Sequence, residues 1–450
     1  MNDSVFTHTQ DQLKQLARDV LAIAKENGAT SASVEISEGS GLAVTVRKGK
    51  VETIEQNKDK GIGVTVYSGQ RRGHASTSDF SAASLRATVE AAYNIARFTA
   101  EDPAAGLPDA DLLETKPRDL RLCYPWQIDA EEAVQIAQRC EAAAFAVDPR
   151  VTNSEGASVY VQQSHFVAAN SLGFCAGYPF SRHTLSVAPI AGRGNNMQRD
   201  DWYSSARDPK KLADPEKIGR YAAERALARL NARKLDTRTC PVLFEAPLAA
   251  GLLGAFVQAT SGGALYRKSS FLLDSLGQSI FPSHIQIVED PHLVGAVGSA
   301  PFDEEGVRTQ RRKVVDDGVL QGYFLSTYTA RKLGMQTTGN AGGSHNLELT
   351  SRQTKRADDF AGMLRKMGTG LLVTELMGQG TNYVTGDYSR GASGYWVENG
   401  VIQYPVEEIT IAGNMKDMFQ SIVAIGNDVL TRGNKSTGSI LIEKMVVAGN

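Results

Sequence analysis

The residues best suited by type and spacing to bind a ligand lie in a glycine-rich stretch between Gly368 and Gly391. Glycine lets backbone amides approach a ligand closely, and Asp387 and Arg390 could orient the amine and the carboxylate of a peptide. In the alternative interpretation, the glycines serve tight turns and bulges and the two charged side chains simply pair. The candidate substrate-binding residues of this stretch are Gly378, Gln379, Gly380, Asp387, Ser389 and Arg390.

A second glycine-rich cluster runs from Thr338 to Asn346 and contains His345. His345 is the one histidine that we would test as part of a site, and we add it to the candidate substrate-binding residues. A flexible loop without a ligand is the alternative interpretation of the cluster.

Several common catalytic devices are absent from the sequence. There is no Gly-x-Ser-x-Gly elbow for a serine nucleophile, and the single Gly-Lys pair, Gly49-Lys50, precedes Val51 and so cannot form a P-loop. The seven histidines include no pair one helical turn apart, the usual start of a zinc site. His284 and His292 are the closest pair, but Pro291 lies between them, so a shared metal ion is not favoured. We therefore predict no catalytic residue and no metal ligand in this chain.

The elements that must position these residues follow from periodicity. Apolar residues at helical spacing predict a helix that ends at Asn27-Gly28, and alternating runs predict an antiparallel meander. The predicted strands are residues 33–37, 42–47, 51–56 and 63–67, separated by glycines. A second helix then runs along Leu85 to Ala96.

Further along the chain, capping and turn signals mark the remaining elements. Asp129-x-x-Glu132 is a capping box, and Asp214-Pro215 begins another helix. Residues 170–173 favour a hairpin, as do Asp317-Gly318 and Asn399-Gly400. The predicted fold class is α+β, with a C-terminal part that is mainly antiparallel sheet. The predicted domains are residues 1–115, 116–235 and 236–450.

Composition narrows the class of protein. With 42% hydrophobic and 22% charged residues, the 450-residue chain resembles folded globular proteins. The net charge of -2, with both signs interspersed, argues against nucleic acid as the main partner. Four scattered cysteines and an acidic N-terminus without an apolar run favour the cytoplasm. The uncharged stretch 246–266 is too broken by Pro and Gly to span a membrane and predicts a buried helix.

Longer motifs in the second half of the chain resemble the PmbA (TldE) branch of the TldD/PmbA family, also described as modulators of DNA gyrase. The matching segments are residues 262–271, 301–309, 377–380, 385–391, 395–400 and 409–414. The resemblance implies a bacterial peptidase system in which a zinc-bearing TldD-type subunit pairs with a PmbA-type subunit to degrade unfolded peptides, including bacteriocin precursors and antitoxins.

One departure from the zinc-bearing branch matters for function. That branch carries His-Glu-x-x-x-His on a helix after a strand, and the corresponding positions here are near Leu253 to Gln258. No histidine occurs between His183 and His284, and no cysteine follows Cys240 to match the family's later cysteine ligand. The resemblance therefore implies a subunit without a cofactor of its own and zinc in the partner.

Three functions remain open from the sequence. In the first, the chain is a noncatalytic subunit that shapes the substrate chamber of a TldD-type zinc-bearing partner and holds extended peptides through strand edges and glycine-rich loops. In the second, it is a peptide-binding or regulatory homodimer that acts on gyrase or on a toxin–antitoxin pair. In the third, an unrecognised site around His345 and Asp387 hydrolyses peptides.

Overall fold

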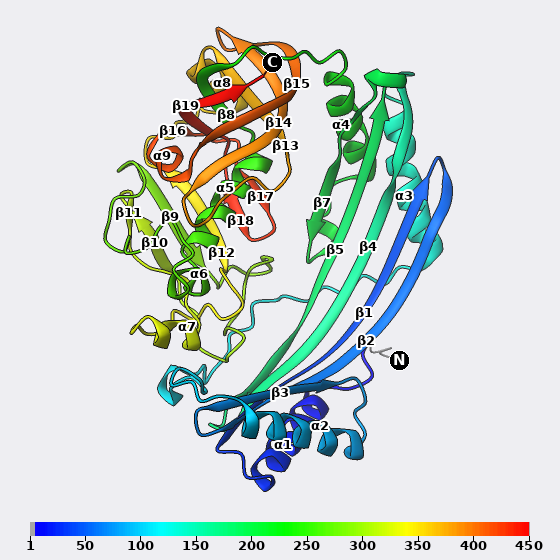
Figure 1. The fold of residues 1–450 in the computed structure, drawn as a ribbon. Coiled ribbons are helices and arrows are strands. Elements are labelled where there is room, and N and C mark those ends of the chain that lie inside the picture. Colours follow the sequence, from blue (N-terminus) through cyan, green and yellow to red (C-terminus); the bar gives the residue numbers. More distant parts are fainter. Residues whose placement is uncertain (1–4, 450) are drawn as a thin grey trace. The chain divides into compact units, whose positions relative to one another are not determined.

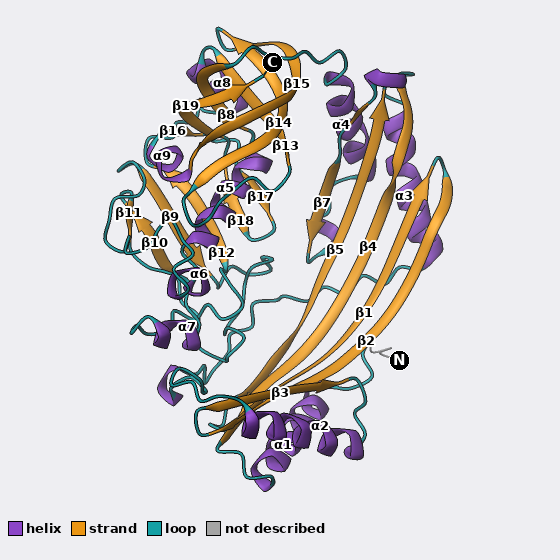
Figure 2. Ribbon diagram, in the orientation of Figure 1, coloured by secondary structure: helices purple, strands orange, loops and turns teal. Residues whose placement is uncertain are grey.

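The computed structural model describes residues 5–449, which form two compact units (Figure 1). The first comprises the described residues up to Leu227 together with residues 292–309 and 326–332, and the second comprises the remaining described residues. The α+β fold class is confirmed, because helices pack on largely antiparallel sheets in both units (Figure 2). The division into three domains stays a prediction.

The first unit is built on one seven-stranded antiparallel sheet with the order β3-β2-β1-β4-β5-β6, in which β7 also pairs with β5. Its strands are β1 (Ser31–Arg47), β2 (Lys50–Ser68), β3 (Arg71–Thr77), β4 (Val151–Asn170), β5 (Cys175–Ala191), β6 (Gln198–Arg199) and β7 (Trp202–Ala206). Its helices are α1 (Gln10–Glu26), α2 (Ala82–Phe98), α3 (Ala130–Phe145), α4 (Pro215–Ala228) and α7 (Thr327–Lys332).

Two helix pairs cover one face of this sheet. The even-numbered residues of β1 are nearly all buried, as a strand with one covered face requires. Val34 and Ile36 pack in a cluster under α1 and α2, while Val44 and Val46 pack in a second cluster with α3 and α4. Figure 1 shows the α1–α2 pair near one end of the long strands and α3 near the other.

The four short strands predicted for the meander are wrong in their boundaries. Residues 33–47 form the single strand β1, and residues 51–67 lie in the single strand β2. Gly41 does not end a strand, because the residue is paired with Asn57 of β2 and with Gln162 of β4. Glycine at this position leaves room for the Asn57 side chain, whose Oδ1 would lie 2.3 Å from an added Cβ.

The second unit contains two six-stranded sheets, with orders β11-β10-β9-β12-β18-β17 and β15-β14-β13-β8-β19-β16. The strands of the first sheet are β9 (Ile285–Asp290), β10 (Arg312–Asp316), β11 (Val319–Leu320), β12 (Asn346–Ser351), β17 (Leu430–Arg432) and β18 (Lys435–Thr437). Those of the second are β8 (Arg238–Phe244), β13 (Gly370–Met377), β14 (Asp387–Glu398), β15 (Val401–Asn414), β16 (Ile422–Ile425) and β19 (Ile440–Ala448).

Strand β15 also pairs with β19, so β8, β13, β14, β15 and β19 close into a ring. The helices of this unit are α5 (Ala246–Ala259), α6 (Gly262–Tyr266), α8 (Phe360–Met367) and α9 (Met415–Gln420). The hairpins predicted at Asp317-Gly318 and Asn399-Gly400 are confirmed, since all four residues have positive φ. Parallel pairing occurs between β8 and β13 and between β12 and β18.

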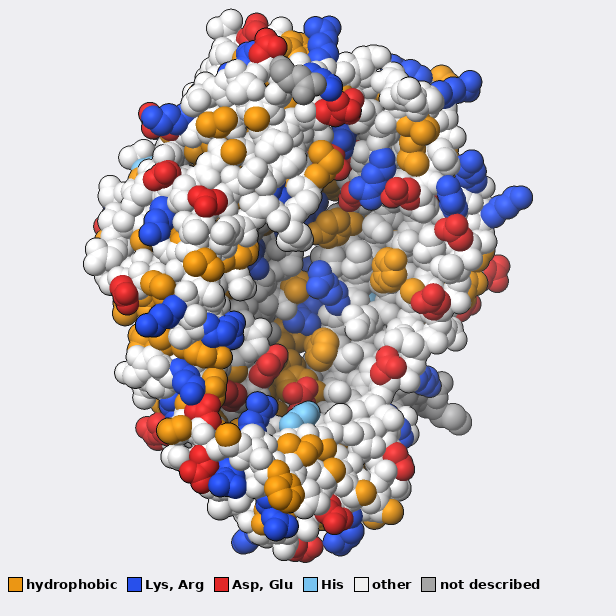
Figure 3. All heavy atoms as spheres, in the orientation of Figure 1, with side chains coloured by type: hydrophobic (Ala, Val, Ile, Leu, Met, Phe, Trp, Pro, Cys, Tyr) orange, Lys and Arg blue, Asp and Glu red, His pale blue; other side chains and the backbone are white. Residues whose placement is uncertain are grey.

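The surface and the helices agree with the balanced composition. On the face shown in Figure 3, acidic and basic side chains are interspersed and form no single basic field. Within residues 5–449, every helix falls short of the length and hydrophobicity that a membrane-crossing helix needs.

Candidate functional site

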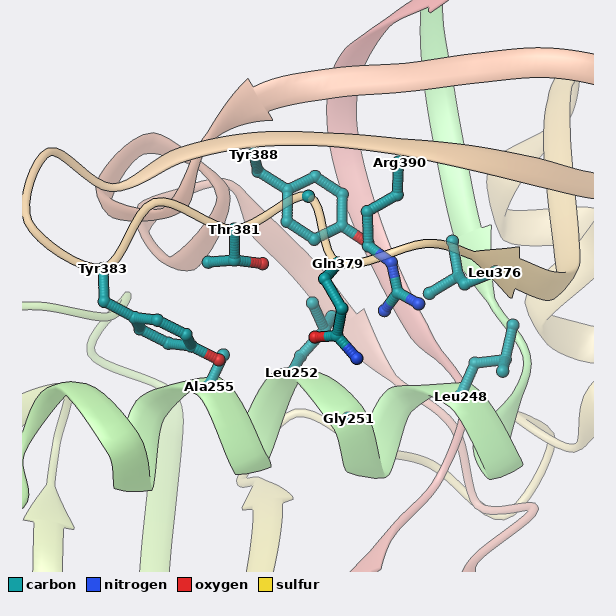
Figure 4. A pocket seen from close by; sticks show the side chains of 11 residues that line it. Leu248, Gly251, Leu252, Ala255, Leu376, Gln379, Thr381, Tyr383, Tyr388 and Arg390 are labelled. Atoms are coloured by element: carbon teal, nitrogen blue, oxygen red, sulfur yellow. The ribbon is translucent and has the colours of Figure 1, made fainter.

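A pocket lies against helix α5 in the second unit (Figure 4). Its cavity volume is about 100 Å³. One side is the face of α5 formed by Leu248, Gly251, Leu252 and Ala255. The other lining residues come from β13, β14 and the segment between them, and are Leu376, Gln379, Gly380, Thr381, Tyr383, Tyr388 and Arg390. In Figure 4 the side chains of Gln379, Tyr383 and Arg390 point toward the helix.

Helix α5 has two different faces. Leu248, Gly251, Leu252 and Ala255 recur at helical spacing, so they share the face that lines the pocket. On the adjacent face, one turn beyond Leu252, Phe256 is fully buried and its ring lies 5.7 Å from that of Phe281. The small residues of the first face leave space for the cavity, while the second face anchors the helix in the core.

Strand alternation decides which of the candidate residues on β14 face the pocket. Tyr388 and Arg390 are two residues apart, lie on the same side of the strand and both line the pocket. Asp387 is exposed, belongs to the other side of β14 and accepts a 2.6 Å hydrogen bond from Thr385 Oγ1. The alternative interpretation that Asp387 and Arg390 pair with each other is therefore wrong.

Two polar side chains of the pocket, Tyr388 and Arg390, each have a buried atom without a hydrogen bond among the described residues. The side chain of Tyr388 is 4% exposed, and burial raises the pKa of its phenol to about 12, although the adjacent Arg390 guanidinium opposes this rise. The phenol is therefore protonated at neutral pH. Among residues 5–449, neither Tyr388 Oη nor Arg390 Nε has a hydrogen-bond partner.

Beside the pocket, the last residues of strand β13 are paired with a strand on one side only. β14 pairs with β13 from Gly370 to Met377, whereas β8 pairs with it only from Leu371 to Val373. In the part of the chain that the structure describes, residues 374–377 therefore have no strand on the β8 side. Leu376 lies on this stretch and lines the pocket.

The other candidate residues lie in different surroundings. Gly378 and Ser389 are exposed and are not pocket-lining residues. Gly380 lines the pocket, and only glycine fits there, because a Cβ would lie 1.6 Å from the Ser389 carbonyl oxygen. The binding roles of all these residues stay predictions.

His345 lies apart from the pocket-lining residues. It is 8% exposed, and its ring Nε2 is 2.9 Å from the Gly339 carbonyl oxygen. Its backbone amide donates to Glu289 Oε1 at 2.8 Å, and the same carboxylate oxygen accepts from Asn340 Nδ2 at 2.8 Å. These contacts tie the second glycine-rich cluster to strand β9.

Sequence reasoning did not single out Tyr383, Tyr388 or the pocket face of α5. The available signal was the spacing of Leu248, Gly251 and Ala255, which places small residues on one helix face. That pattern is also typical of helices packed closely against a neighbour, so it could not be assigned to a pocket.

The α5 positions that correspond to the zinc motif do not fit zinc. Zinc in proteins is bound by imidazole, thiolate or carboxylate groups. Residues 253–258 offer only the Gln258 amide as a polar side chain, and Leu253 and Phe256 are buried in the core. Within residues 5–449, no three His, Cys, Asp or Glu side chains gather as a metal site would require.

Comparison with known protein families gives three ordered matches. Residues 32–96 match the PmbA/TldA metallopeptidase domain 1, residues 123–230 the central domain and residues 237–449 the C-terminal domain. Together the matches cover most of the chain.

Individual relatives agree with these matches. The chain is 48% identical to metalloprotease PmbA of Escherichia coli O157:H7 over 429 residues, which is 95% of this chain and 94% of the relative. It is 45% identical to the PmbA homologue of Haemophilus influenzae, with 100% and 99% of the two chains covered. The metalloprotease TldD homologue of the same organism is 24% identical, with 82% of this chain and 80% of that protein covered.

A solved structure shares the fold over nearly the whole chain. It is a protein of Bacteroides thetaiotaomicron named as a candidate modulator of DNA gyrase, with a TM-score of 0.91 and 28% identity. The match covers 98% of this chain and 100% of that one.

Proposed function

Because the chain belongs to the PmbA/TldD metallopeptidase family, we propose that it is the noncatalytic, peptide-holding subunit of a metalloprotease complex. In this proposal a second, TldD-type subunit binds the zinc that activates water. The single observation that carries the proposal is the composition of α5, which has no metal-binding donor among residues 253–258.

The geometry of the second unit supports a role in holding peptides. The edge of β13 at residues 374–377, which has no partner strand on the β8 side, would offer backbone amides and carbonyls to an added strand. Such pairing depends on the peptide backbone and little on its sequence. A folded protein has its backbone groups already paired, so this edge would select unfolded or extended substrates.

The pocket beside this edge would receive one residue of the bound chain. Leu248, Leu252 and Leu376 supply an apolar lining, and Arg390 and Tyr388 supply polar donors. Residues of this subunit would therefore bind and orient the peptide, whereas bond cleavage would take place at the partner's metal.

The partner in this proposal is a zinc-bearing paralogue. Haemophilus influenzae has both a PmbA homologue, 45% identical to this chain, and a TldD homologue, 24% identical to it. One organism thus holds a close relative of this chain together with a family member of the other kind. We place the complex in the cytoplasm, in keeping with the four free cysteines of the described chain.

The proposal is tested by reconstitution. This chain and a TldD-type subunit from the same organism are purified separately and mixed with an unfolded peptide substrate. We expect cleavage by the mixture that neither protein shows alone. A control peptide methylated on its backbone nitrogens should be cleaved much more slowly, because it cannot complete the pairing with β13. Full activity of the zinc-bearing subunit without this chain would refute the proposal.

A regulatory homodimer is the competing function. It predicts that this chain forms a stable dimer with itself and binds no zinc-bearing paralogue. Sedimentation of the separate proteins and of their mixture distinguishes the two assemblies.

A further inference from the structure

The pocket against α5 combines buried donors with an absence of negative charge. Its lining includes Arg390 but no Asp or Glu. Among residues 5–449, Arg390 has no ion-pair partner. Its guanidinium lies close enough to the Tyr388 hydroxyl to lower the pKa of that phenol, but neither Arg390 Nε nor Tyr388 Oη has a partner with good hydrogen-bond geometry. Buried polar groups of native proteins nearly always have a partner, so two unpaired donors at one cavity point to an acceptor that binds from outside the chain.

The shape of the donors indicates which acceptor fits. A guanidinium presents two parallel N–H groups that match the two oxygens of a carboxylate. The Tyr388 hydroxyl, held protonated by its surroundings, adds one further donor on the same side of β14. A phosphate carries more than one negative charge, whereas the lining supplies Arg390 as its single cation beside the apolar side chains of Leu248, Leu252 and Leu376.

We propose that this pocket binds the C-terminal carboxylate of a peptide, with Arg390 contacting both carboxylate oxygens and Tyr388 donating a further hydrogen bond. The inference rests on the proposed function, because it names the part of the peptide that the subunit holds. The apolar face of α5 accommodates the side chain of the terminal residue.

The size of the cavity agrees with a small terminal residue. Its volume of about 100 Å³ corresponds to a few water molecules, each of which occupies about 30 Å³ in the liquid. Gly251 forms part of the floor, and a Cβ built on it meets no atom within 4 Å. A larger side chain at position 251 would therefore extend into the cavity without straining the helix.

The pocket is tested by titrating the full chain with tri-alanine and with tri-alanine amide in a calorimeter. We expect tri-alanine to bind and its amide to bind at least about tenfold more weakly, as the loss of a charge-assisted hydrogen bond predicts. A third ligand, acetyl-Ala-Glu-Ala-amide, carries its carboxylate only on a side chain, and inorganic phosphate serves as a fourth. Both should bind weakly.

Variants of the pocket locate the binding site. We expect Arg390→Met and Gly251→Leu to abolish the binding of tri-alanine, and Tyr388→Phe and Arg390→Lys to weaken it several-fold. Arg365→Met is the matched control, because Arg365 is exposed on α8 and is not a pocket residue. Near-ultraviolet circular dichroism confirms that each variant is folded. If Arg390→Met fails to fold, the Gly251→Leu variant and the comparison of tri-alanine with its amide still test whether the pocket binds a carboxylate.

Three results would overturn the proposal: equal affinity for tri-alanine and its amide, equal affinity for tri-alanine and the glutamate-bearing amide, or full binding of tri-alanine by Gly251→Leu.

The outcomes also separate this inference from the proposed function. Reconstituted cleavage without a preference for the free carboxylate would refute the carboxylate pocket and leave the subunit role intact. Carboxylate binding by this chain without any gain in cleavage on mixing would refute the subunit role and leave the pocket intact.

Discussion

Two buried histidines in the first unit are held in their neutral form. His165 Nε2 lies 3.2 Å from Glu38 Oε2, and His183 Nε2 lies 2.9 Å from the Tyr124 carbonyl oxygen. Burial lowers the pKa of both imidazoles below 6.5, even though these partners favour the charged form. Burial by itself would raise the pKa of the Glu38 carboxyl. The hydrogen bonds from His8 and His165 have the larger combined effect, so the pKa of this carboxyl is lowered below 4.5.

These shifts predict a loss of stability in acid. At pH values between 6.5 and the lowered pKa values of the folded imidazoles, the unfolded chain binds protons that the folded chain does not. Stability should therefore be fully present above about pH 6.5 and fall as the pH is lowered through it, with Glu38 adding a further loss at lower pH. Urea unfolding at a series of pH values from 8 to 5 measures this, and a free energy of unfolding that is constant or rises toward pH 5 would contradict it.

At the scale of elements, close approaches of backbones decide the packing as much as the apolar side chains do. Strand β3 lies so near helix α2 that a Cβ on Gly73 would be 1.9 Å from the Ala92 carbonyl oxygen and 2.5 Å from the Ala96 nitrogen. Ala92 and Ala96 are themselves fully buried. The small residues of both elements thus set how closely the helix packs on the sheet.

Gly73→Ala should accordingly destabilise the protein by about 1–3 kcal/mol, the usual cost of overpacking a core. The matched control is Gly61→Ala on β2, where the nearest atom to an added Cβ is the Thr77 carbonyl oxygen at 4.0 Å. We expect that change to be within about 0.5 kcal/mol of neutral. Chemical denaturation of both variants checks the difference, and equal stabilities would show that β3 can move away from α2 at no cost.

For the whole molecule, the lack of metal-binding side chains at residues 253–258 of α5 predicts how the protein responds to metal removal. Dialysis against a chelator should leave the unfolding midpoint of this chain unchanged, because residues 253–258 provide no group that zinc prefers. The same treatment should abolish cleavage by the mixture with a zinc-bearing subunit, and added zinc should restore it. A midpoint that falls in chelator and recovers with zinc would show that this chain has a metal site of its own.

The sequence alone determined the elements with strong local signals and the family. Asp129 forms the predicted capping box at the start of α3, and Asp317-Gly318 forms the predicted hairpin turn, because each depends on neighbours a few residues away. The ordered motifs from residue 262 onward identified the family without any coordinates. The absence of histidine from the α5 segment was likewise readable in the sequence.

The tertiary structure alone decided which of the candidate residues meet. Arg390 joins Tyr388 and the small face of α5, although residues 251 and 390 are far apart in the chain. Asp387 turns away because neighbouring residues on a strand face opposite sides, and His345 is held by Glu289. Periodicity predicts which face of an element is apolar, but only the packing of one element on another shows that a face such as Gly251 and Ala255 borders a cavity.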